Sequence, residues 1–225
     1  MISVIFDLDG TLVDSEPNYY ESGRRTLERH GVREFTWEQH SRFIGIGTLE
    51  TLEILKERYA LQAPVEQLLA EQNAAYLELA RTGTEVFPEM RKFVERLRAE
   101  GVPMAVASGS SREAIDAVLS GTGLDALLTT VVSAEEVAHG KPAPDVFLEA
   151  ARRLGAEPAD CVVVEDAAPG ALAARAAGMG CVAVPYVAQT AHDEAFAQAG
   201  LLFPGGQREF TADAAYEWLA ARGAA

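Results

Sequence analysis

Two acidic residues, Asp7 and Asp9, stand in the segment DLDGT (residues 7–11), directly after a short apolar run at 2–6. Neighbouring carboxylates repel each other and are costly in a protein core. A divalent cation would explain them, because Mg²⁺ prefers hard oxygen ligands and pairs with phosphate. One carboxylate can then attack phosphorus while the other handles a proton. A turn with an Asp cap and a flexible glycine explains the segment equally well when it is taken alone.

A second acidic pair, Glu165 and Asp166, follows another apolar run at 161–164. If both runs are strands of one parallel sheet, the two acidic pairs end at the same edge of that sheet. The carboxylates gathered there would repel one another strongly without a cation. The repetition therefore favours a metal site over two separate turns.

Two further motifs supply groups that suit phosphate. Ser108 and Gly109 follow the apolar run 103–107, where a hydroxyl and backbone amides can hold a phosphoryl oxygen, although Ser-Gly at such a junction more often caps a helix. Lys141 begins a proline-rich loop, where a cation can neutralise a carboxylate and a transferring phosphoryl group. Taken alone, Lys141 is better explained as a surface lysine beside a turn. Arg112 either faces a substrate from the first turn of its helix or is exposed on that helix.

The segments between these motifs predict an α/β fold. Apolar runs without alternation are typical of strands covered on both faces of a parallel sheet. Strand alternating with helix predicts right-handed crossovers, and open α/β sheets bind ligands at the carboxyl ends of their strands, where all the motifs fall. The predicted strands are 2–6, 103–107, 161–164 and 181–184, with a weaker candidate at 129–132, and the predicted helices are 87–100, 112–119, 146–154 and 168–177.

The stretch from about residue 15 to 84 breaks this alternation. It has no convincing strand, and its three helical patterns lie at 18–30, 50–59 and 65–81. We therefore expect a core domain formed by residues 1–14 and 85–225, with residues 15–84 inserted as a separate helical domain.

The composition is that of an ordinary globular protein, with 48% hydrophobic and 24% charged residues in a chain of 225. No apolar run approaches the ~18 residues that a membrane span needs, and the short apolar start lacks a basic leader, so we expect a cytoplasmic protein. The net charge of −15 disfavours nucleic acid and anionic membranes as partners, but it does not disfavour a small anion in a pocket with a metal and a lysine. Cys161 and Cys181 are expected as buried free thiols.

Taken together and in order, the DxDGT segment, the strand-end serine, the GKPxPD loop and the strand-end Glu-Asp pair resemble the haloacid dehalogenase superfamily of phosphohydrolases. The match extends over nearly the whole chain, and the insert resembles the C1-type cap of the phosphoglycolate phosphatase and β-phosphoglucomutase branch. The resemblance implies a Rossmann-like parallel sheet with helices on both faces, an inserted helical-bundle cap, and Mg²⁺ as the cofactor.

The resemblance also implies roles for single residues. Asp7 forms an aspartyl-phosphate. Asp9 protonates the leaving group and then activates water, while its backbone carbonyl binds the metal. Lys141 tethers Asp7 and the phosphoryl oxygens. Asp166 binds Mg²⁺ directly and Glu165 supports it directly or through water, so the expected metal set is Asp7, Asp9, Asp166 and Glu165, and the expected substrate-binding residues are Ser108, Gly109, Thr11 and Arg112.

The sequence departs from the family pattern at two places. Ala167 stands where the family usually has Ser or Thr, which removes a hydroxyl beside the metal site. β-Phosphoglucomutase-like members carry an arginine just after the cap glycine, where it holds the distal phosphate of the sugar, and residues 45–50 contain none. This absence favours a phosphatase over a mutase, unless Arg24, Arg25 or Arg42 substitutes.

We therefore expect a Mg²⁺-dependent phosphatase, monomeric or weakly dimeric, that hydrolyses a small phosphorylated metabolite such as a sugar phosphate or phosphoglycolate, with Asp7 as the nucleophile. A sugar phosphomutase is the nearest alternative. A dehalogenase needs no metal and would leave Asp9, Glu165 and Asp166 unexplained. A catalytically silent protein that binds phosphorylated ligands is the alternative from another class, and the presence of Asp7, Asp9, Lys141 and Asp166 argues against it.

Overall fold

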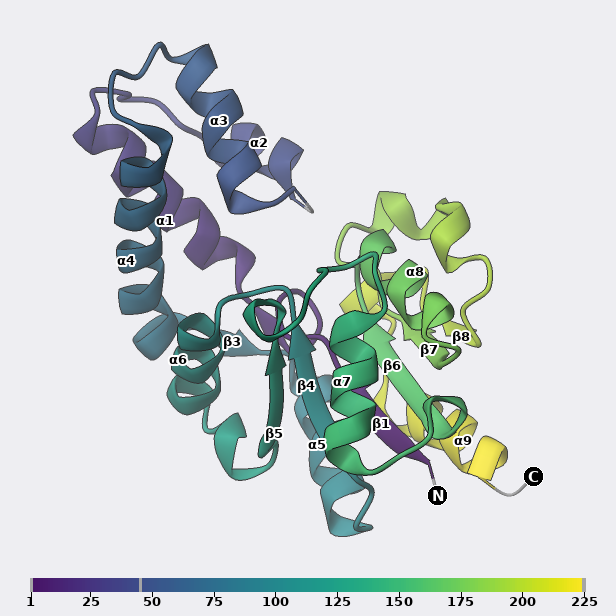
Figure 1. The fold of residues 1–225 in the computed structure, drawn as a ribbon. Helices are drawn as coiled ribbons and strands as arrows, with labels where there is room; N and C mark the ends of the chain where they lie inside the picture. The colour runs from purple at the N-terminus through teal and green to yellow at the C-terminus, as the bar shows by residue number, and fades with distance from the viewer. Residues whose placement is uncertain (1, 45, 224–225) are drawn as a thin grey trace. The chain divides into compact units, whose positions relative to one another are not determined.

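The computed structural model describes residues 2–44 and 46–223, and the chain divides into two compact units (Figure 1). One unit comprises Met1–Asp14 with Glu85–Ala225, and the other is Ser15–Thr84. The chain passes from one unit to the other after residue 14 and returns after residue 84, where the sequence predicts the insertion to begin and end. We propose that the units are the core and cap domains.

A six-stranded sheet forms the centre of the first unit, and each neighbouring pair of strands runs parallel. The predicted parallel α/β sheet is confirmed, and the five predicted strands match the observed ones to within one residue at each end. From edge to edge, the strands are β5 (Thr130–Ser133), β4 (Met104–Ser108), β1 (Ser3–Phe6), β6 (Cys161–Glu165), β7 (Gly180–Ala183) and β8 (Leu201–Leu202).

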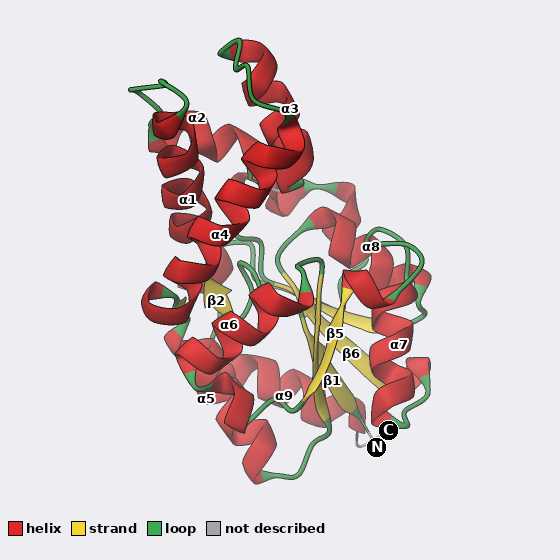
Figure 2. Cartoon of the chain, turned by 60° about the vertical axis from the view of Figure 1, so that its left-hand side comes forward, coloured by secondary structure: helices red, strands yellow, loops and turns green. Residues whose placement is uncertain are grey.

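Helices cover both faces of this sheet (Figure 2). On one face, Ile5 and Val163 belong to a buried cluster with α7 (Asp145–Leu154) and α8 (Ala168–Ala176). On the other face, the ring of Phe6 lies 6.0 Å from that of Phe93 in α5 (Pro88–Ala99), edge to face. Since Ile5 and Phe6 are consecutive in a strand, their side chains point to opposite faces.

The remaining helices of the first unit are α6 (Arg112–Thr122), between β4 and β5, and α9 (Ala212–Gly223), which packs against α5. Ser111 caps α6 by accepting a hydrogen bond from the amide of Ala114. Helix α9 was not predicted, because its alanine-rich sequence shows little contrast between a buried and an exposed face.

A short antiparallel pair, β2 (Val13–Asp14) and β3 (Glu85–Val86), lies where the chain leaves and re-enters the first unit. Val13 is paired with Val86, and Asp14 with Glu85. The two ends of the insertion are therefore adjacent within the first unit.

The second unit is helical, and its described residues contain no strand. Its helices are α1 (Glu16–Arg29), α2 (Trp37–His40), α3 (Thr48–Arg58) and α4 (Val65–Gly83). Helices α1 and α4 pack together, with the rings of Tyr19 and Tyr76 stacked at 4.3 Å. Gly45, at the predicted cap glycine, lies outside the described residues. The core of the unit consists of Leu27, Phe35, Phe43, Leu52, Leu55, Leu61 and Leu68.

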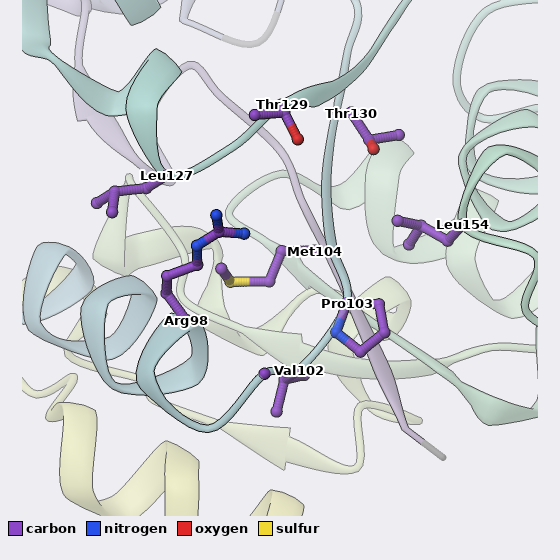
Figure 3. A pocket seen from close by; sticks show the side chains of 9 residues that line it. Arg98, Val102, Pro103, Met104, Leu127, Thr129, Thr130 and Leu154 are labelled. Carbon is purple, nitrogen blue, oxygen red and sulfur yellow. The ribbon is translucent and has the colours of Figure 1, made fainter.

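A cavity of about 210 Å³ opens at the amino-terminal ends of β4 and β5, opposite the strand ends that bear the sequence motifs (Figure 3). Arg98, Met104, Thr129 and Thr130 are among the residues that line it. No helix of the described residues is long and apolar enough to cross a membrane.

Candidate active site

The loop after β1 places Asp7 at the end of the central strand, with 6% of its surface exposed. Its backbone amide donates to the carbonyl of Val164 in β6 at 3.0 Å, which extends the strand pairing into the loop. Gly10 then turns the chain at a φ of +79°. A Cβ at Gly10 would lie only 2.4 Å from Oδ2 of Asp166, so glycine is required both for the turn and for the approach of Asp166.

The ammonium of Lys141 joins two of the predicted acidic residues. Its Nζ lies 2.5 Å from Oδ1 of Asp7 and 2.7 Å from Oε1 of Glu165. It also lies 4.8 Å from the centre of the Phe147 ring in α7. The lysine is therefore a buried bridge between the loop after β1 and the end of β6, and not a surface residue beside a turn.

Glu165 is 1% exposed, and its other carboxylate oxygen is also engaged. Oε2 accepts hydrogen bonds from the backbone amides of Asp166 and Ala167, both at 2.8 Å. With both oxygens in use, Glu165 orients Lys141 and the following loop, and we do not retain it as a direct metal ligand. The backbone at Ala167 makes this contact without a side-chain hydroxyl.

Asp166 faces the loop after β1. Its Oδ1 accepts a hydrogen bond from Oγ1 of Thr11 at 3.0 Å. Thr11 is fully buried, so its hydroxyl orients Asp166 instead of being open to a substrate. The predicted closeness of the two acidic segments is thus present in the structure.

Burial raises the pKa of Asp7 from its ordinary value of 3.8 to about 8, against the attraction of Lys141, which lowers it. Burial, followed by repulsion from Glu165 and Asp7, raises the pKa of Asp166 well above its ordinary value. Burial alone would lower the pKa of Lys141, but the attraction of Asp7 and Glu165 raises it above its usual range. Three carboxyl groups share one ammonium here, and a further positive charge would relieve their repulsion.

Asp9 is held by two serines, one at the end of β4 and one in the loop that follows. Oγ of Ser110 donates to Oδ2 of Asp9 at 2.7 Å, and Oγ of Ser108 lies 3.4 Å from the same atom. Ser110 is itself fixed, since its carbonyl accepts a hydrogen bond from the hydroxyl of Ser133 at 2.7 Å. Gly109 is exposed, with open space where a side chain would stand, so its backbone is accessible.

Arg112 is turned toward other acids. Its Nε lies 2.9 Å and 3.1 Å from the two carboxylate oxygens of Asp116 one turn along α6, and its Nη1 lies 3.6 Å from Glu136. Its backbone amide donates to Glu135. We therefore do not retain Arg112 as a substrate-binding residue.

The arginines suggested as substitutes for the missing cap arginine are likewise engaged by acids of the helical unit. Arg24 and Arg25 both bind Glu21, and Arg42 binds Glu38. These pairs lie three or four positions apart on the helices, so they are local surface pairs.

Sequence reasoning missed some residues that shape the site. Gly170 in α8 faces Glu165, and a Cβ there would lie 1.6 Å from Oε1 of that residue. Gln207, near the carboxyl terminus, donates to backbone carbonyls of the DLDGT loop. Neither was found because each acts through a contact between residues far apart in the chain, and neither belongs to a motif. For Gly170, the only signal in the sequence is its position shortly after the Glu165-Asp166 pair. For Gln207, the sequence offers no signal.

The described residues contain no group of three His, Cys, Asp or Glu side chains arranged as a metal cluster. Mg²⁺ does not require one, because it commonly keeps several waters and binds one or two carboxylates together with substrate phosphate. Asp7 and Asp166, with the backbone carbonyl of Asp9, supply such a set of hard oxygen ligands, and their excess negative charge suits a divalent ion. The residues present therefore fit Mg²⁺.

Comparison with known proteins identifies the class to which this fold and site belong. A family model for haloacid dehalogenase-like hydrolases matches residues 3–178. The chain therefore belongs to the haloacid dehalogenase-like hydrolases, which confirms the resemblance drawn from the motifs. The expected enzyme class, a hydrolase of phosphoric monoesters, agrees with the phosphatases among its relatives.

Among those relatives, the chain is 35% identical over 181 residues to fructose-1-phosphate phosphatase YqaB of Escherichia coli K12, covering 80% of this chain and 95% of that protein. It is 32% identical over 184 residues to a phosphorylated carbohydrates phosphatase of Thermotoga maritima, covering 80% and 82%. It is 33% identical over 190 residues to the bifunctional riboflavin kinase/FMN phosphatase of Arabidopsis thaliana, where it spans 84% of this chain but only half of that protein.

Solved structures share the fold. A haloacid dehalogenase family hydrolase from Deinococcus radiodurans R1, with bound phosphate and sodium, is 30% identical with a TM-score of 0.65, over 80% of this chain and 79% of that one. A β-phosphoglucomutase from Clostridium difficile has a TM-score of 0.77 over the whole of both chains, and at 23% identity it shows the fold alone.

Proposed function

We propose that this protein is a Mg²⁺-dependent phosphatase that hydrolyses a small phosphate monoester through an aspartyl-phosphate on Asp7. The observation that supports this most directly is the buried carboxylate of Asp7, which Lys141 holds through Oδ1 at 2.5 Å. A carboxylate that a cation holds at the end of a central strand is oriented to act as a nucleophile, and bound Mg²⁺ would supply the further positive charge that keeps it ionised.

In the first step, the Oδ2 atom of Asp7, for which Lys141 is not the partner, attacks the phosphorus of the ester. An O–P bond forms to Asp7 and the bond from phosphorus to the ester oxygen breaks. Asp9, in its protonated form, gives its proton to the leaving oxygen, which departs as an alcohol. Ser110 holds the carboxyl group of Asp9 in place at 2.7 Å.

In the second step, water attacks the same phosphorus. Asp9, now a carboxylate, takes a proton from that water, and the bond between phosphorus and Asp7 breaks. Inorganic phosphate leaves and Asp7 is restored. The two steps together consume one ester and one water and release one alcohol and one phosphate.

The charge on the transferring group must be neutralised throughout. Bound Mg²⁺ would supply electrostatic stabilisation of the phosphoryl oxygens, with Asp7, Asp166 and the Asp9 carbonyl to hold it. Lys141 supplies a second positive charge, and its raised pKa keeps it protonated at any ordinary pH. Ser108 and the exposed backbone at Gly109 are the groups that we propose to bind phosphoryl oxygens.

For the substrate class we favour sugar phosphates, because two relatives that align over most of their length are named for phosphorylated sugars or carbohydrates. We propose that residues 15–84 select among such esters. Transfer back to the sugar, as in a mutase, would require a grip on a second phosphate, and the candidate arginines are engaged by neighbouring acids.

The test is phosphate release from a panel of phosphorylated metabolites and one chromogenic phosphate ester, with Mg²⁺ and with a chelator. We expect turnover only with Mg²⁺, and a covalent phosphoprotein that hydroxylamine cleaves when the reaction is quenched. Asp7→Asn should abolish both signals, because an amide cannot form the acyl phosphate.

Asp125→Asn, an exposed carboxylate changed in the same way, should leave both signals at the wild-type level. Turnover by Asp7→Asn equal to wild type would refute the mechanism. Isomerisation of a sugar phosphate stimulated by a sugar bisphosphate, without net phosphate release, would replace the phosphatase with a mutase.

A further inference from the structure

Gln207 makes a contact that the reaction scheme does not use. It lies just before the end of a 3₁₀ turn, Gly206–Arg208, and its Nε2 donates to the carbonyl of Thr11 at 2.9 Å and to that of Gly10 at 3.3 Å. These two carbonyls belong to the turn that follows Asp9. A side chain near the carboxyl terminus is thus attached to the loop that bears the nucleophile and the proposed acid.

The backbone conformation of Gly206 places Gln207 where it can make this contact. Gly206 has a φ of +62°, and a Cβ there would lie 2.3 Å from the carbonyl oxygen of Pro185. Only glycine permits this approach, which brings the segment beside Pro185 and Tyr186. The amide of Gly206 is also bound, to the carbonyl of Phe203 at 2.8 Å.

Tyr186 extends the same attachment to the second acidic loop. Its hydroxyl donates to Oδ1 of Asp14 at 2.9 Å, and its backbone amide lies 3.4 Å from the carbonyl of Asp166. Between them, Gln207 and Tyr186 therefore contact the DLDGT loop, the residue Asp14 that follows it, and the backbone of Asp166.

The side-chain oxygen of Gln207 differs from its nitrogen in having no partner in the described part of the chain. Its Oε1 is buried and has no hydrogen-bond partner among the residues that the structure describes. Burying an unpaired amide oxygen costs free energy, which the two hydrogen bonds from Nε2 to the loop must offset. The buried, unpaired oxygen is thus the cost of placing the Nε2 donor against the carbonyls of Gly10 and Thr11.

We propose that Gln207, which lies beyond the residues 3–178 matched by the family model, is a positioning residue for the catalytic loop. By fixing the carbonyls of Gly10 and Thr11, it sets where the carbonyl of Asp9 and the hydroxyl of Thr11 lie, and through Thr11 it sets the orientation of Asp166. This proposal rests on the proposed function, since these groups are the ones assigned to the metal and the proton.

The experiment compares Gln207→Met and Gln207→Glu with wild type. Methionine keeps the size and removes the donor, whereas glutamate also places an acceptor against two carbonyls. Mg²⁺ binding is measured by calorimetry in the absence of substrate. We expect the Kd for Mg²⁺ to rise about tenfold in Gln207→Met and further in Gln207→Glu, in the range found when groups that orient metal ligands are lost.

Kinetics on the chromogenic ester give a second result. We expect kcat at saturating Mg²⁺ to fall about tenfold while KM for the ester stays within about twofold of wild type, since the changed contacts orient reacting groups and do not bind the substrate. Gln198→Met is the matched control, because Gln198 is exposed in the same carboxyl-terminal part of the chain, and it should change neither quantity.

Unchanged Mg²⁺ affinity and kcat in a folded Gln207→Met protein would overturn the proposal, whatever its melting temperature. If the variants do not fold, hydrogen exchange of the wild type decides. Amides in residues 8–13 should be protected about as strongly as those of β1, and rapid exchange there would overturn it. Calorimetry and exchange need no turnover, so an absence of phosphatase activity would refute the proposed function without affecting this test.

Discussion

Lys141 donates to both Asp7 and Glu165 in a site where its side chain is 11% exposed. A buried ammonium is tolerable only when its charge is balanced, and the two carboxylates are tolerable only for the same reason. The lysine is therefore part of the folded structure as well as part of the chemistry, and its removal has consequences for both.

Lys141→Met should lower the free energy of unfolding by about 3–5 kcal/mol, because it removes the cation that balances the charge of two buried carboxyl groups. The loss should be smaller near pH 6 than near pH 9. The pKa of Asp7 is raised to about 8, so Asp7 is mostly protonated near pH 6, where the attraction to Lys141 is weak, and mostly ionised near pH 9, where the variant loses that attraction in full. Urea denaturation at the two pH values measures this.

Lys92→Met provides the control, since Lys92 is exposed and pairs with Glu89 on the surface of α5. It should change stability by less than about 1 kcal/mol at either pH. A Lys141→Met protein as stable as this control would mean that Asp7 and Glu165 are not held as a charged pair with the lysine.

The two thiols give a separate prediction. Cys161 and Cys181 are buried, and burial raises the pKa of Cys181 to about 12 and that of Cys161 above its ordinary value. Because the thiolate is the reactive form, both should react slowly with a disulfide reagent at about pH 8 in the native protein and rapidly in denaturant. Stoichiometric reaction of the native protein within seconds would show that one thiol is accessible.

At the scale of secondary structure elements, the site depends on how closely α8 approaches the end of β6. Gly170 lies in the first turns of α8, where any Cβ would stand 1.6 Å from the carboxylate of Glu165. The helix can take this position only because residue 170 has no side chain. Its closeness in turn keeps Glu165 directed at Lys141 and the amides of 166 and 167.

Gly170→Ala should displace the carboxylate of Glu165 and so release Lys141. We expect kcat to fall about tenfold or more, as when groups that orient a metal site are lost, and stability to fall by about 1–3 kcal/mol from overpacking. Steady-state kinetics and thermal melting measure the two effects.

Gly83→Ala is the matched control, since a Cβ there would meet, among the described residues, an oxygen of Asn18 no nearer than 4.0 Å. It lies at the end of a helix, where alanine is favoured, so stability should be unchanged or slightly higher. Full activity in Gly170→Ala would show that Glu165 can leave its position without consequence.

The motifs at strand ends were predictable because each combines a short apolar run with a residue that is costly without a function. That reasoning correctly placed Asp7, Asp166 and Lys141 together. It did not show that Glu165 and Arg112 are already engaged by neighbouring groups, because the type of a residue does not reveal its hydrogen-bond partners. It also missed Gln207 and Gly170, whose roles follow from contacts between distant parts of the chain.

At the scale of the whole molecule, each unit contains a buried hydrophobic cluster of its own among the residues that the structure describes. The cluster that includes Ile5, Phe147 and Phe196 draws its residues from the first unit, and the cluster that includes Leu27 and Leu68 draws its residues from the second. Each unit therefore has its own source of stability. The sequence predicts the insertion because the alternation of strand and helix stops at residue 15 and resumes after 84, and the two compact units divide at the same residues.

This arrangement predicts that the first unit folds without the second. Because Asp14 and Glu85 are paired in the β2–β3 ladder, the two-residue turn Asn-Gly can replace residues 15–84 and close a hairpin. We expect the shortened protein to unfold cooperatively, to keep Mg²⁺ binding, and to hydrolyse the chromogenic ester while losing its discrimination among metabolites.

Thermal melting, calorimetry and the substrate panel measure these properties, and Asp7→Asn in the shortened protein is the control. A shortened protein without a cooperative transition would show that residues 15–84 are needed for folding, and retained discrimination would show that the first unit itself selects the substrate.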